Sequence, residues 1–169
     1  MSDLQKIDSS VWSFAPIADF QSKVLILGTM PGKESLRMNE YYAHPQNAFW
    51  KILFGLYNVP FTTNYQVKKE LLLKNGIALW DVLRNCERSS SLDTDIKQEI
   101  PNDLRTFLIT HPAISKIFFN GKGAAKFFSK YFADISLANE ALPSTSPAHA
   151  LKWEQKLAIW QIINNNGHK

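Results

Sequence analysis

Apolar residues occur along this chain in short unbroken runs, and longer stretches with apolar residues at helical spacing separate these runs. A short apolar run bounded by Gly, Asn or Ser is typical of a strand that is buried on both faces of a sheet. Apolar residues three and four apart predict amphipathic helices. The predicted strands are residues 23–27, 76–83, 116–120 and a short strand between 135 and 142, and the predicted helices are residues 47–57, 65–74, 103–110, 124–131 and 151–164.

This alternation of strands and helices predicts an α/β fold whose mostly parallel sheet is covered on both faces. The polar residues 84–95 are expected to form a long functional loop. Residues 1–20 are expected to form an N-terminal arm that packs Val11, Trp12 and Phe14 on the body of the protein. Because 169 residues suit one core and no linker or repeat interrupts the chain, residues 1–169 are expected to form a single domain.

The composition excludes several classes of protein. No apolar run approaches the length of a membrane span and the first residues lack the form of a signal peptide, so we expect a cytoplasmic protein without a membrane partner. Cys86 is the only cysteine, which excludes an intramolecular disulfide and a thiolate-rich metal site. The net charge of +4 favours a polyanionic partner only mildly, because many basic proteins never bind nucleic acid. We expect the protein to be a monomer.

Polar residues follow each of the four predicted strands. Because the carboxyl ends of parallel strands meet at one edge of a sheet, these loops are expected to share the edge at which open α/β folds bind ligands. The first loop begins with Gly28-Thr-Met-Pro-Gly32, a sequence that allows backbone to approach a ligand closely, and ends at Asn47. The pooled segments are residues 29–47, 81–95, 120–122 and 144–149.

Each of these loops also has a purely structural interpretation. The Gly-Pro loop could be only a turn that ends a strand, and Asn47 could be only the N-cap of the helix that follows it. The glycines around Lys122 could form a tight strand-to-helix turn, since they lack the spacing of a nucleotide-binding P-loop. His44 and His149 have no carboxylate or cysteine at ligand spacing, so we expect no metal site. Cys86 is expected to be an inert buried thiol.

Considered together, the four loops carry a resemblance to a known family. The chain resembles the uracil-DNA glycosylase superfamily, and within it the hypoxanthine-DNA glycosylase (DNA-deoxyinosine glycosylase) branch. The similarity extends from Val24 to Trp160, and HPQNAFW is similar to the HPxNxFW block of mismatch-specific uracil glycosylases. The block FNGK, followed later by a Pro-Ser-x-Ser loop, is similar to the corresponding blocks of thymine-DNA glycosylases. The resembling blocks are LILGTMPGKESLRMNEYYAHPQNAFW, GIALWDVLRNCERSSSLD, FNGKGA and LPSTSPAHA.

The resemblance implies a three-layer α/β/α sandwich with a central four-stranded sheet, and a monofunctional base-excision enzyme without cofactor or metal. Its partner would be damaged double- or single-stranded DNA, from which the enzyme flips the target base into a pocket. The implied DNA-binding residues are Gly32, Lys122, Ser144, Thr145, Ser146, Pro147 and His149, and the implied base pocket is formed by Gly28, Thr29, Met30, Pro31, Tyr42, Phe49 and Asp81. Phe49 or Tyr42 would stack on the extruded base.

The resemblance also bears on the roles of individual site residues. Many superfamily members position the attacking water with a polar residue at the place of Met30, which cannot do so, and the deoxyinosine branch uses the Asn of its HPxN block, here Asn47. Ser144 replaces a base-contacting His. Residues 147–150 would form the minor-groove insertion loop, with His149, which stands where relatives have Asn, near the gap or on a phosphate. Asp81 could accept the N1–H of hypoxanthine or the N3–H of uracil and would reject adenine, although a cap or a salt bridge is an equally good interpretation.

Other functions stay open on the sequence alone. A uracil or mismatch-specific glycosylase would use the same loops, and a non-catalytic module for damaged DNA would keep the basic cleft without the water-positioning Asn47. A small-molecule hydrolase or nucleoside-binding protein would fit the fold, since a fold does not fix the chemistry. A bifunctional lyase would need an amine such as that of Lys33 or Lys122.

Overall fold

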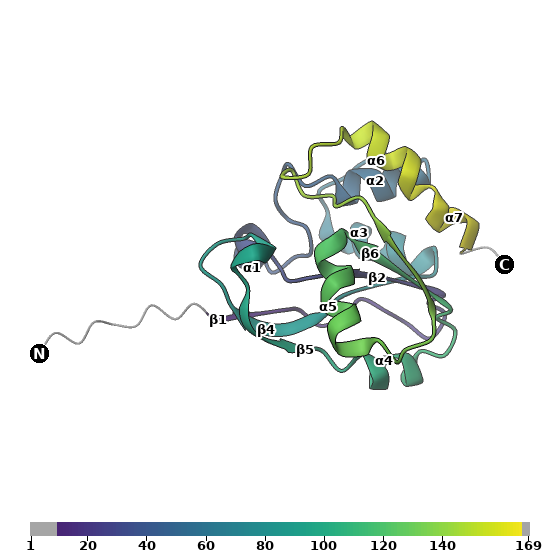
Figure 1. The fold of residues 1–169 in the computed structure, drawn as a ribbon. Coiled ribbons are helices and arrows are strands. Elements are labelled where there is room, and N and C mark those ends of the chain that lie inside the picture. Colours follow the sequence, from purple (N-terminus) through teal and green to yellow (C-terminus); the bar gives the residue numbers. More distant parts are fainter. Residues whose placement is uncertain (1–9, 167–169) are drawn as a thin grey trace, which may run out of the picture.

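A parallel sheet of four strands forms the centre of the protein, as the computed structural model shows for residues 10–166 (Figure 1). The strand order is β3-β2-β6-β7, and every neighbouring pair is parallel. From β2 the chain goes to β3 on one side, and it later returns to place β6 on the other side of β2. The strand order therefore reverses between β2 and β6, and open α/β folds bind ligands at such a point. The strands are β2 (Val24–Gly28), β3 (Ile77–Asp81), β6 (Lys116–Asn120) and β7 (Ala138–Leu142).

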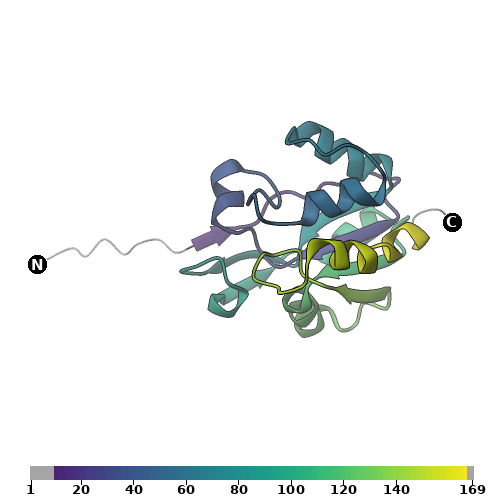
Figure 2. The same cartoon turned by 90° about the horizontal axis from the view of Figure 1, so that it is seen from above.

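Helices cover both faces of this sheet, and the alternation of side chains along β2 divides the core in two. Val24 and Ile26 pack with α2, α3 and the C-terminal helices, whereas Leu25 and Leu27 pack with α4 and α5. Seen from above, α6 lies across the sheet beside α2 (Figure 2). These layers confirm the predicted three-layer α/β/α sandwich. The covering helices are α2 (Phe49–Leu56), α3 (Tyr65–Lys74), α4 (Leu104–Thr110), α5 (Lys122–Phe132), α6 (Trp153–Trp160) and α7 (Ile162–Asn166).

A second, antiparallel sheet adjoins the first and was not predicted. Its order is β1-β4-β5, with β1 at Ser10–Trp12, β4 at Leu83–Glu87 and β5 at Lys97–Pro101. The predicted strand 76–83 is therefore wrong at its end: the chain leaves the parallel sheet after Asp81 and enters β4 one residue later. The backbone N–H of Val82 donates to the carbonyl of Gly28 across 2.8 Å, which ties this crossing to the end of β2.

The N-terminal arm closes the outer edge of β3. Ile17 and Leu79 form an antiparallel bridge in which each backbone N–H donates to the other's carbonyl, at 2.9 and 2.8 Å. Phe14 packs against the core as predicted, and Val11 is half-buried. The prediction for Trp12 is wrong, because 57% of its surface is exposed. Residues 1–9 of the predicted arm lie outside the described residues.

Three further predictions need correction. Helix α1 (Lys33–Met38) occupies part of the predicted first loop and ends at Asn39, whose φ of 55° is left-handed. The predicted loop 84–95 is shortened by β4, and residues Asp93–Asp95 form a 3-10 turn. The predicted helix 151–164 is two helices, α6 and α7, that meet at Gln161. Helices long and apolar enough to cross a membrane are absent from residues 10–166.

Candidate functional site

The loops at the carboxyl ends of the parallel strands enclose a cavity of about 720 Å³. They lie together at the end of the sheet that carries α1 (Figure 1). The structure therefore places most of the sequence-predicted site residues at one cavity, although the chain separates them widely. The lining groups are Gly28, Thr29, Met30, Pro31, Gly32, Lys33, Glu34, Ser35, Tyr41, Tyr42, His44, Asn47, Asp81, Ser91, Leu92, Asp93, Asn120, Ser144, Thr145, Ser146, Pro147, Ala148 and His149.

Gly28, Tyr42 and Asp81 converge in the depth of the cavity. Gly28 and Asp81 are register partners at the ends of β2 and β3, which sets the carboxylate beside the glycine. A Cβ atom on Gly28 would lie 2.6 Å from Asp81 Oδ1 and 2.6 Å from the Tyr42 hydroxyl, which is far inside contact distance. A glycine is therefore required here so that the carboxylate and the hydroxyl can approach the backbone of β2.

The Asp81 carboxyl is 3% exposed, and its Oδ2 is buried without a hydrogen-bond partner. Burial raises the pKa of Asp81 to about 7, the negative charge of Asp93 adds to the rise, and the Arg88 guanidinium opposes it. Asp81 is thus neither the helix cap nor the ion-pair partner that the structural interpretation offered. A buried carboxyl with a free oxygen at a cavity wall is suited to bind a polar group of a ligand.

Tyr42 forms a wall of the cavity and Phe49 supports it from behind. The two rings stack with centroids 4.2 Å apart and planes 26° from parallel, and Phe49 is fully buried. The prediction that Phe49 could stack on a base is therefore wrong, because Tyr42 covers it. The Tyr42 hydroxyl is buried without a partner, and burial beside the charge of Asp81 keeps its pKa well above the ordinary value, so the hydroxyl stays protonated.

Asn47 is half-buried and lines the cavity just before α2. The helix begins at Phe49, so Asn47 stands one residue before the N-cap position, which Ala48 occupies. Its Oδ1 nevertheless accepts a hydrogen bond of 3.0 Å from the backbone N–H of Phe49. This bond fixes the side-chain amide, and it leaves Nδ2 and a second lone pair of Oδ1 for a water or a ligand in the cavity.

The loop after β7 is fastened to the end of β6 by Asn120. Asn120 Nδ2 donates to the Thr145 hydroxyl and Asn120 Oδ1 accepts from the Thr145 backbone N–H, both at 2.9 Å. The Thr145 carbonyl in turn accepts from the N–H of Ala48 at 3.0 Å, next to Asn47. The prediction that Thr145 binds a DNA phosphate is wrong, because its side chain is 1% exposed and engaged in this network. Thr145 positions the loop instead.

The remaining predicted DNA-binding residues divide between the cavity mouth and the outer surface. Pro147 and His149 are exposed on a turn in which the His149 N–H donates to the Ser146 carbonyl at 3.0 Å. Ser144 and Ser146 are half-buried, and each hydroxyl accepts from a backbone N–H two residues on. Lys122 is exposed at the start of α5 and does not line the cavity.

Sequence reasoning missed two charged residues: Asp93, which lines the cavity, and buried Arg88, which does not line it but contacts the lining residue Pro31. Arg88 is 5% exposed, its guanidinium donates to the Pro31 carbonyl, and its Nε and Nη1 have no partner. Asp93 accepts a 2.9 Å hydrogen bond from the Thr29 hydroxyl, and burial raises its pKa. Both lie in the polar stretch 84–95, which was predicted only as a functional loop, and only the fold shows which of its side chains turn inward.

Metal binding finds no support among the residues that the structure describes, since no group of three His, Cys, Asp or Glu side chains is placed to hold an ion. Cys86 is a free thiol with 1% exposure, and burial raises its pKa, so it is poorly suited as a nucleophile. The lining groups that remain are hydroxyls, amides, carboxyls and backbone, which suit hydrogen bonding to a polar ligand.

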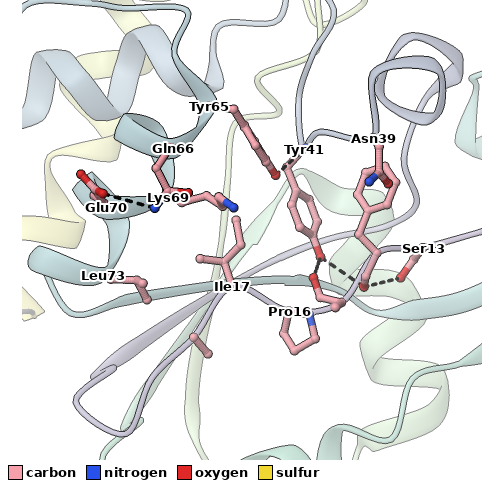
Figure 3. Close-up of a pocket in the computed structure, with 13 residues that line it drawn as sticks. Ser13, Pro16, Ile17, Asn39, Tyr41, Tyr65, Gln66, Lys69, Glu70 and Leu73 are labelled. Atoms are coloured by element: carbon pink, nitrogen blue, oxygen red, sulfur yellow. Dashed lines mark hydrogen bonds between the residues drawn. The ribbon is translucent and has the colours of Figure 1, made fainter.

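A second hollow of about 580 Å³ lies between residues 13–18 and α3 (Figure 3). Its polar groups are occupied with one another: the Tyr41 hydroxyl donates to the Ala15 carbonyl at 2.9 Å, and the Tyr65 hydroxyl accepts from the Tyr41 N–H at 3.1 Å. None of the sequence-predicted site residues lines it. We therefore place the candidate site in the strand-end cavity.

Comparison with known proteins agrees with this architecture. The family model of the uracil DNA glycosylase superfamily matches residues 15–165. A protein of Methanosarcina barkeri named hypoxanthine DNA glycosylase is 36% identical over 148 residues, which are 87% of this chain and 93% of that protein. A protein of the same name from Methanosarcina acetivorans is 29% identical over 151 residues, 89% of this chain and 95% of its own.

A solved structure has the same fold. The solution NMR structure of a candidate uracil DNA glycosylase from Methanosarcina acetivorans superposes with a TM-score of 0.77 at 28% identity, covering 92% of this chain and 99% of that one. The family match spans nearly all of the described fold, including all four strand-end loops. The chain therefore belongs to the uracil DNA glycosylase superfamily.

Proposed function

We propose that the protein is a monofunctional DNA glycosylase that flips hypoxanthine out of DNA and removes it from deoxyinosine by hydrolysis. One observation carries the proposal: a chain of this superfamily, similar over 87% of its length to a hypoxanthine DNA glycosylase, has Asn47 and Asp81 at the same cavity. An extruded base needs an enclosed pocket with polar groups for its edge, and the strand-end cavity supplies both.

Asn47 is the proposed water-positioning residue. Cleavage of the N-glycosidic bond develops positive charge on the sugar, so a water molecule must be held against C1′. The bond from the Phe49 N–H fixes the Asn47 amide, and its free hydrogen-bonding capacity serves the water. Met30, at the place where many relatives have a polar residue, lines the same cavity but offers only a weakly accepting thioether.

Asp81 is the proposed reader of the base. Hypoxanthine carries a donor at N1 where adenine carries an acceptor, so a carboxylate oxygen would bind the first and reject the second. The Asp81 Oδ2 is buried and without a partner, which leaves it available once the base enters. Uracil has a corresponding N3–H donor, and the same contact therefore supports uracil excision as the second candidate activity.

The DNA backbone is proposed to bind at the cavity mouth. Ser144, Ser146 and the backbone of Gly32 line the cavity, and Pro147 and His149 form the exposed turn beside it. Hydroxyls and backbone N–H groups are common ligands of phosphate oxygens. Lys122, exposed at the start of α5, would add a contact to a phosphate farther along the strand.

The experiment is incubation with labelled duplexes and single strands that contain deoxyinosine, uracil, xanthine or a thymine mismatch, followed by alkaline cleavage at abasic sites. We expect cleavage at deoxyinosine. If none of these substrates yields an abasic site, the enzyme assignment fails and the remaining interpretation is a non-catalytic damaged-DNA-binding module. Asn47→Ala should lose activity while it still binds abasic DNA. The matched control is Gln46→Ala, because Gln46 is exposed and does not line the cavity.

Two further measurements test the assigned roles. Asp81→Asn should change the preference among bases more than the affinity for duplex, and an unchanged preference would remove Asp81 from base recognition. Borohydride trapping tests the monofunctional assignment, since Lys33 lines the cavity and a lyase needs such an amine. A covalent adduct that disappears in Lys33→Ala would establish a lyase and contradict our proposal.

A further inference from the structure

Two lysine side chains are buried in the described part of the chain, and their surroundings differ. Lys68 on α3 is 7% exposed, and Lys156 on α6 is 3% exposed. The ammonium of Lys68 lies over the rings of Trp50 and Phe61, with Nζ 5.5 and 5.7 Å from their centroids. The charge of Glu40 also favours its protonated form. Aromatic faces and a nearby carboxylate both stabilise a cation, so the fold itself compensates the charge of Lys68.

Lys156 lacks such compensation. Its Nζ donates to the carbonyl of Ser146 at 3.1 Å. Among the side chains that the structure describes, no carboxylate forms an ion pair with Lys156 and no aromatic ring lies beneath its ammonium. Burial lowers the pKa of Lys156, and no neighbouring charge opposes this effect. Because a buried charge is unfavourable unless an opposite charge compensates it, the retention of a lysine here indicates that an anion comes from outside the fold.

Lys156 contacts the loop that follows β7, which leads into α6 (Figure 1). Ser146 of this loop lines the cavity, and its carbonyl accepts from the His149 N–H as well as from Lys156. Trp160, on the same helix, donates its indole N–H to the Pro143 carbonyl at 2.9 Å. Helix α6 therefore fixes the loop at two carbonyls, and one of the two donors is a buried ammonium.

The same loop offers two hydroxyls whose protons are not engaged. The hydroxyl oxygens of Ser144 and Ser146 each accept a backbone N–H at 3.2 Å, and neither hydroxyl donates to a group among the described residues. Both side chains line the cavity. Free hydroxyl protons beside a positive charge suit an anion with several oxygen atoms, and a phosphodiester of DNA is such an anion.

We propose that the buried ammonium of Lys156 is the countercharge of a DNA phosphate that binds to the hydroxyls of Ser144 and Ser146. This inference rests on the proposed glycosylase function, since it concerns the DNA strand that enters the same cavity. Lys156 acts across the loop rather than by touching the phosphate, because it is buried and does not line the cavity. Its charge is felt there because buried surroundings screen a charge less than water does.

The test compares Lys156→Met with Lys68→Met, since each variant removes one buried charge and keeps an apolar chain of similar length. The probe is a labelled duplex that contains a tetrahydrofuran abasic analogue, and its Kd is measured by fluorescence anisotropy at a series of salt concentrations. Lys156→Met should weaken binding about tenfold at low salt. Its slope of log Kd against log salt concentration should be shallower by about 0.9, the value for one neutralised phosphate. Lys68→Met should bind the duplex as the wild type does.

Urea unfolding separates this role from a purely structural one. Removal of an uncompensated buried charge should leave the urea midpoint of Lys156→Met at or above that of the wild type. The Ser146 carbonyl is not orphaned in this variant, because it keeps the bond from the His149 N–H. A midpoint that falls together with the affinity would show a structural role and overturn the assignment. An equal loss of affinity in Lys68→Met, or an unchanged affinity in Lys156→Met, would overturn it as well.

Binding to the abasic duplex requires no cleavage, so this inference and the proposed function can fail separately. If the wild type cleaves no substrate but binds the duplex in a manner that depends on Lys156, the glycosylase function fails and the countercharge stands. If the enzyme is active and its affinity for the duplex does not depend on Lys156, the countercharge alone is overturned. A wild type that does not bind the duplex would overturn both.

Discussion

Asp81 couples the stability of this fold to pH, and the effect can be worked out from its burial. A carboxyl whose pKa is raised from 3.8 to about 7 holds its proton more tightly in the folded chain than in the unfolded one. At one tenfold change per ~1.4 kcal/mol, the ionised form is about 4 kcal/mol less favourable in the folded state. The contribution to the free energy of unfolding is therefore greatest below the unfolded pKa and is lost as the pH rises through the folded pKa.

Asp81→Asn removes this titration. Urea unfolding of the wild type should show a fall in stability of roughly 2–3 kcal/mol from pH 5 to pH 8 that the variant lacks, so the variant gains relative stability as the pH rises. Asp93, whose pKa burial also raises, remains in both proteins, so the difference between them reports Asp81 together with its charge coupling to Asp93. The control is Asp134→Asn, because Asp134 is an exposed carboxylate that forms an ion pair with Arg105. If Asp81→Asn changes the free energy of unfolding by the same amount at pH 5 and at pH 8, Asp81 is not a buried, titrating carboxyl.

Three further changes test the architecture of the site. Asn120→Ala removes both hydrogen bonds to buried Thr145 and should lower the free energy of unfolding by about 2–4 kcal/mol; an unchanged urea midpoint would contradict this tie. Gly28→Ala sets a Cβ atom 2.6 Å from Asp81 Oδ1 and should reduce hypoxanthine excision roughly 10- to 100-fold. The circular dichroism of this variant should match that of the wild type, and excision at the wild-type rate would disprove the prediction. Thr29→Val removes the hydrogen-bond donor to Asp93 and should lower the free energy of unfolding by about 1–3 kcal/mol. It should also speed proteolysis within residues 88–96, whereas an unchanged rate of proteolysis would show that the hydrogen bond from Thr29 to Asp93 is dispensable.

The sequence predicted the parallel sheet and the meeting of its loops because these follow from local pattern. Continuous apolar runs such as residues 24–27 need helices on both faces, and parallel strands bring Gly28 and Asp81 to one edge wherever they lie in the chain. The positions of Asn47 and Tyr42 at the cavity followed from the same reasoning together with the family resemblance. The chemical roles of these side chains remain predictions.

What the sequence did not predict depends on side-chain direction. Arg88 and Asp93 occur in a polar stretch in which nothing local distinguishes an inward side chain from a solvated one, yet Arg88 is 5% exposed. Phe49 and Thr145 carry suitable groups at suitable positions, but neighbours cover the ring and engage the hydroxyl. The second sheet escaped prediction because the strands β4 and β5 have polar, interrupted patterns that are also typical of loops.

The bridge between Ile17 and Leu79 gives the N-terminal arm a protective role against association between chains. The outer edge of β3 would otherwise offer unpaired backbone groups beside the apolar side chains of residues 77–79, which is the surface on which strands of separate molecules join. A chain shortened to begin at Gln21 would lose this cover. Such a protein would keep every cavity residue and yet be prone to aggregate, so solubility depends on the outer edge of β3, whereas catalysis depends on the carboxyl ends of the strands.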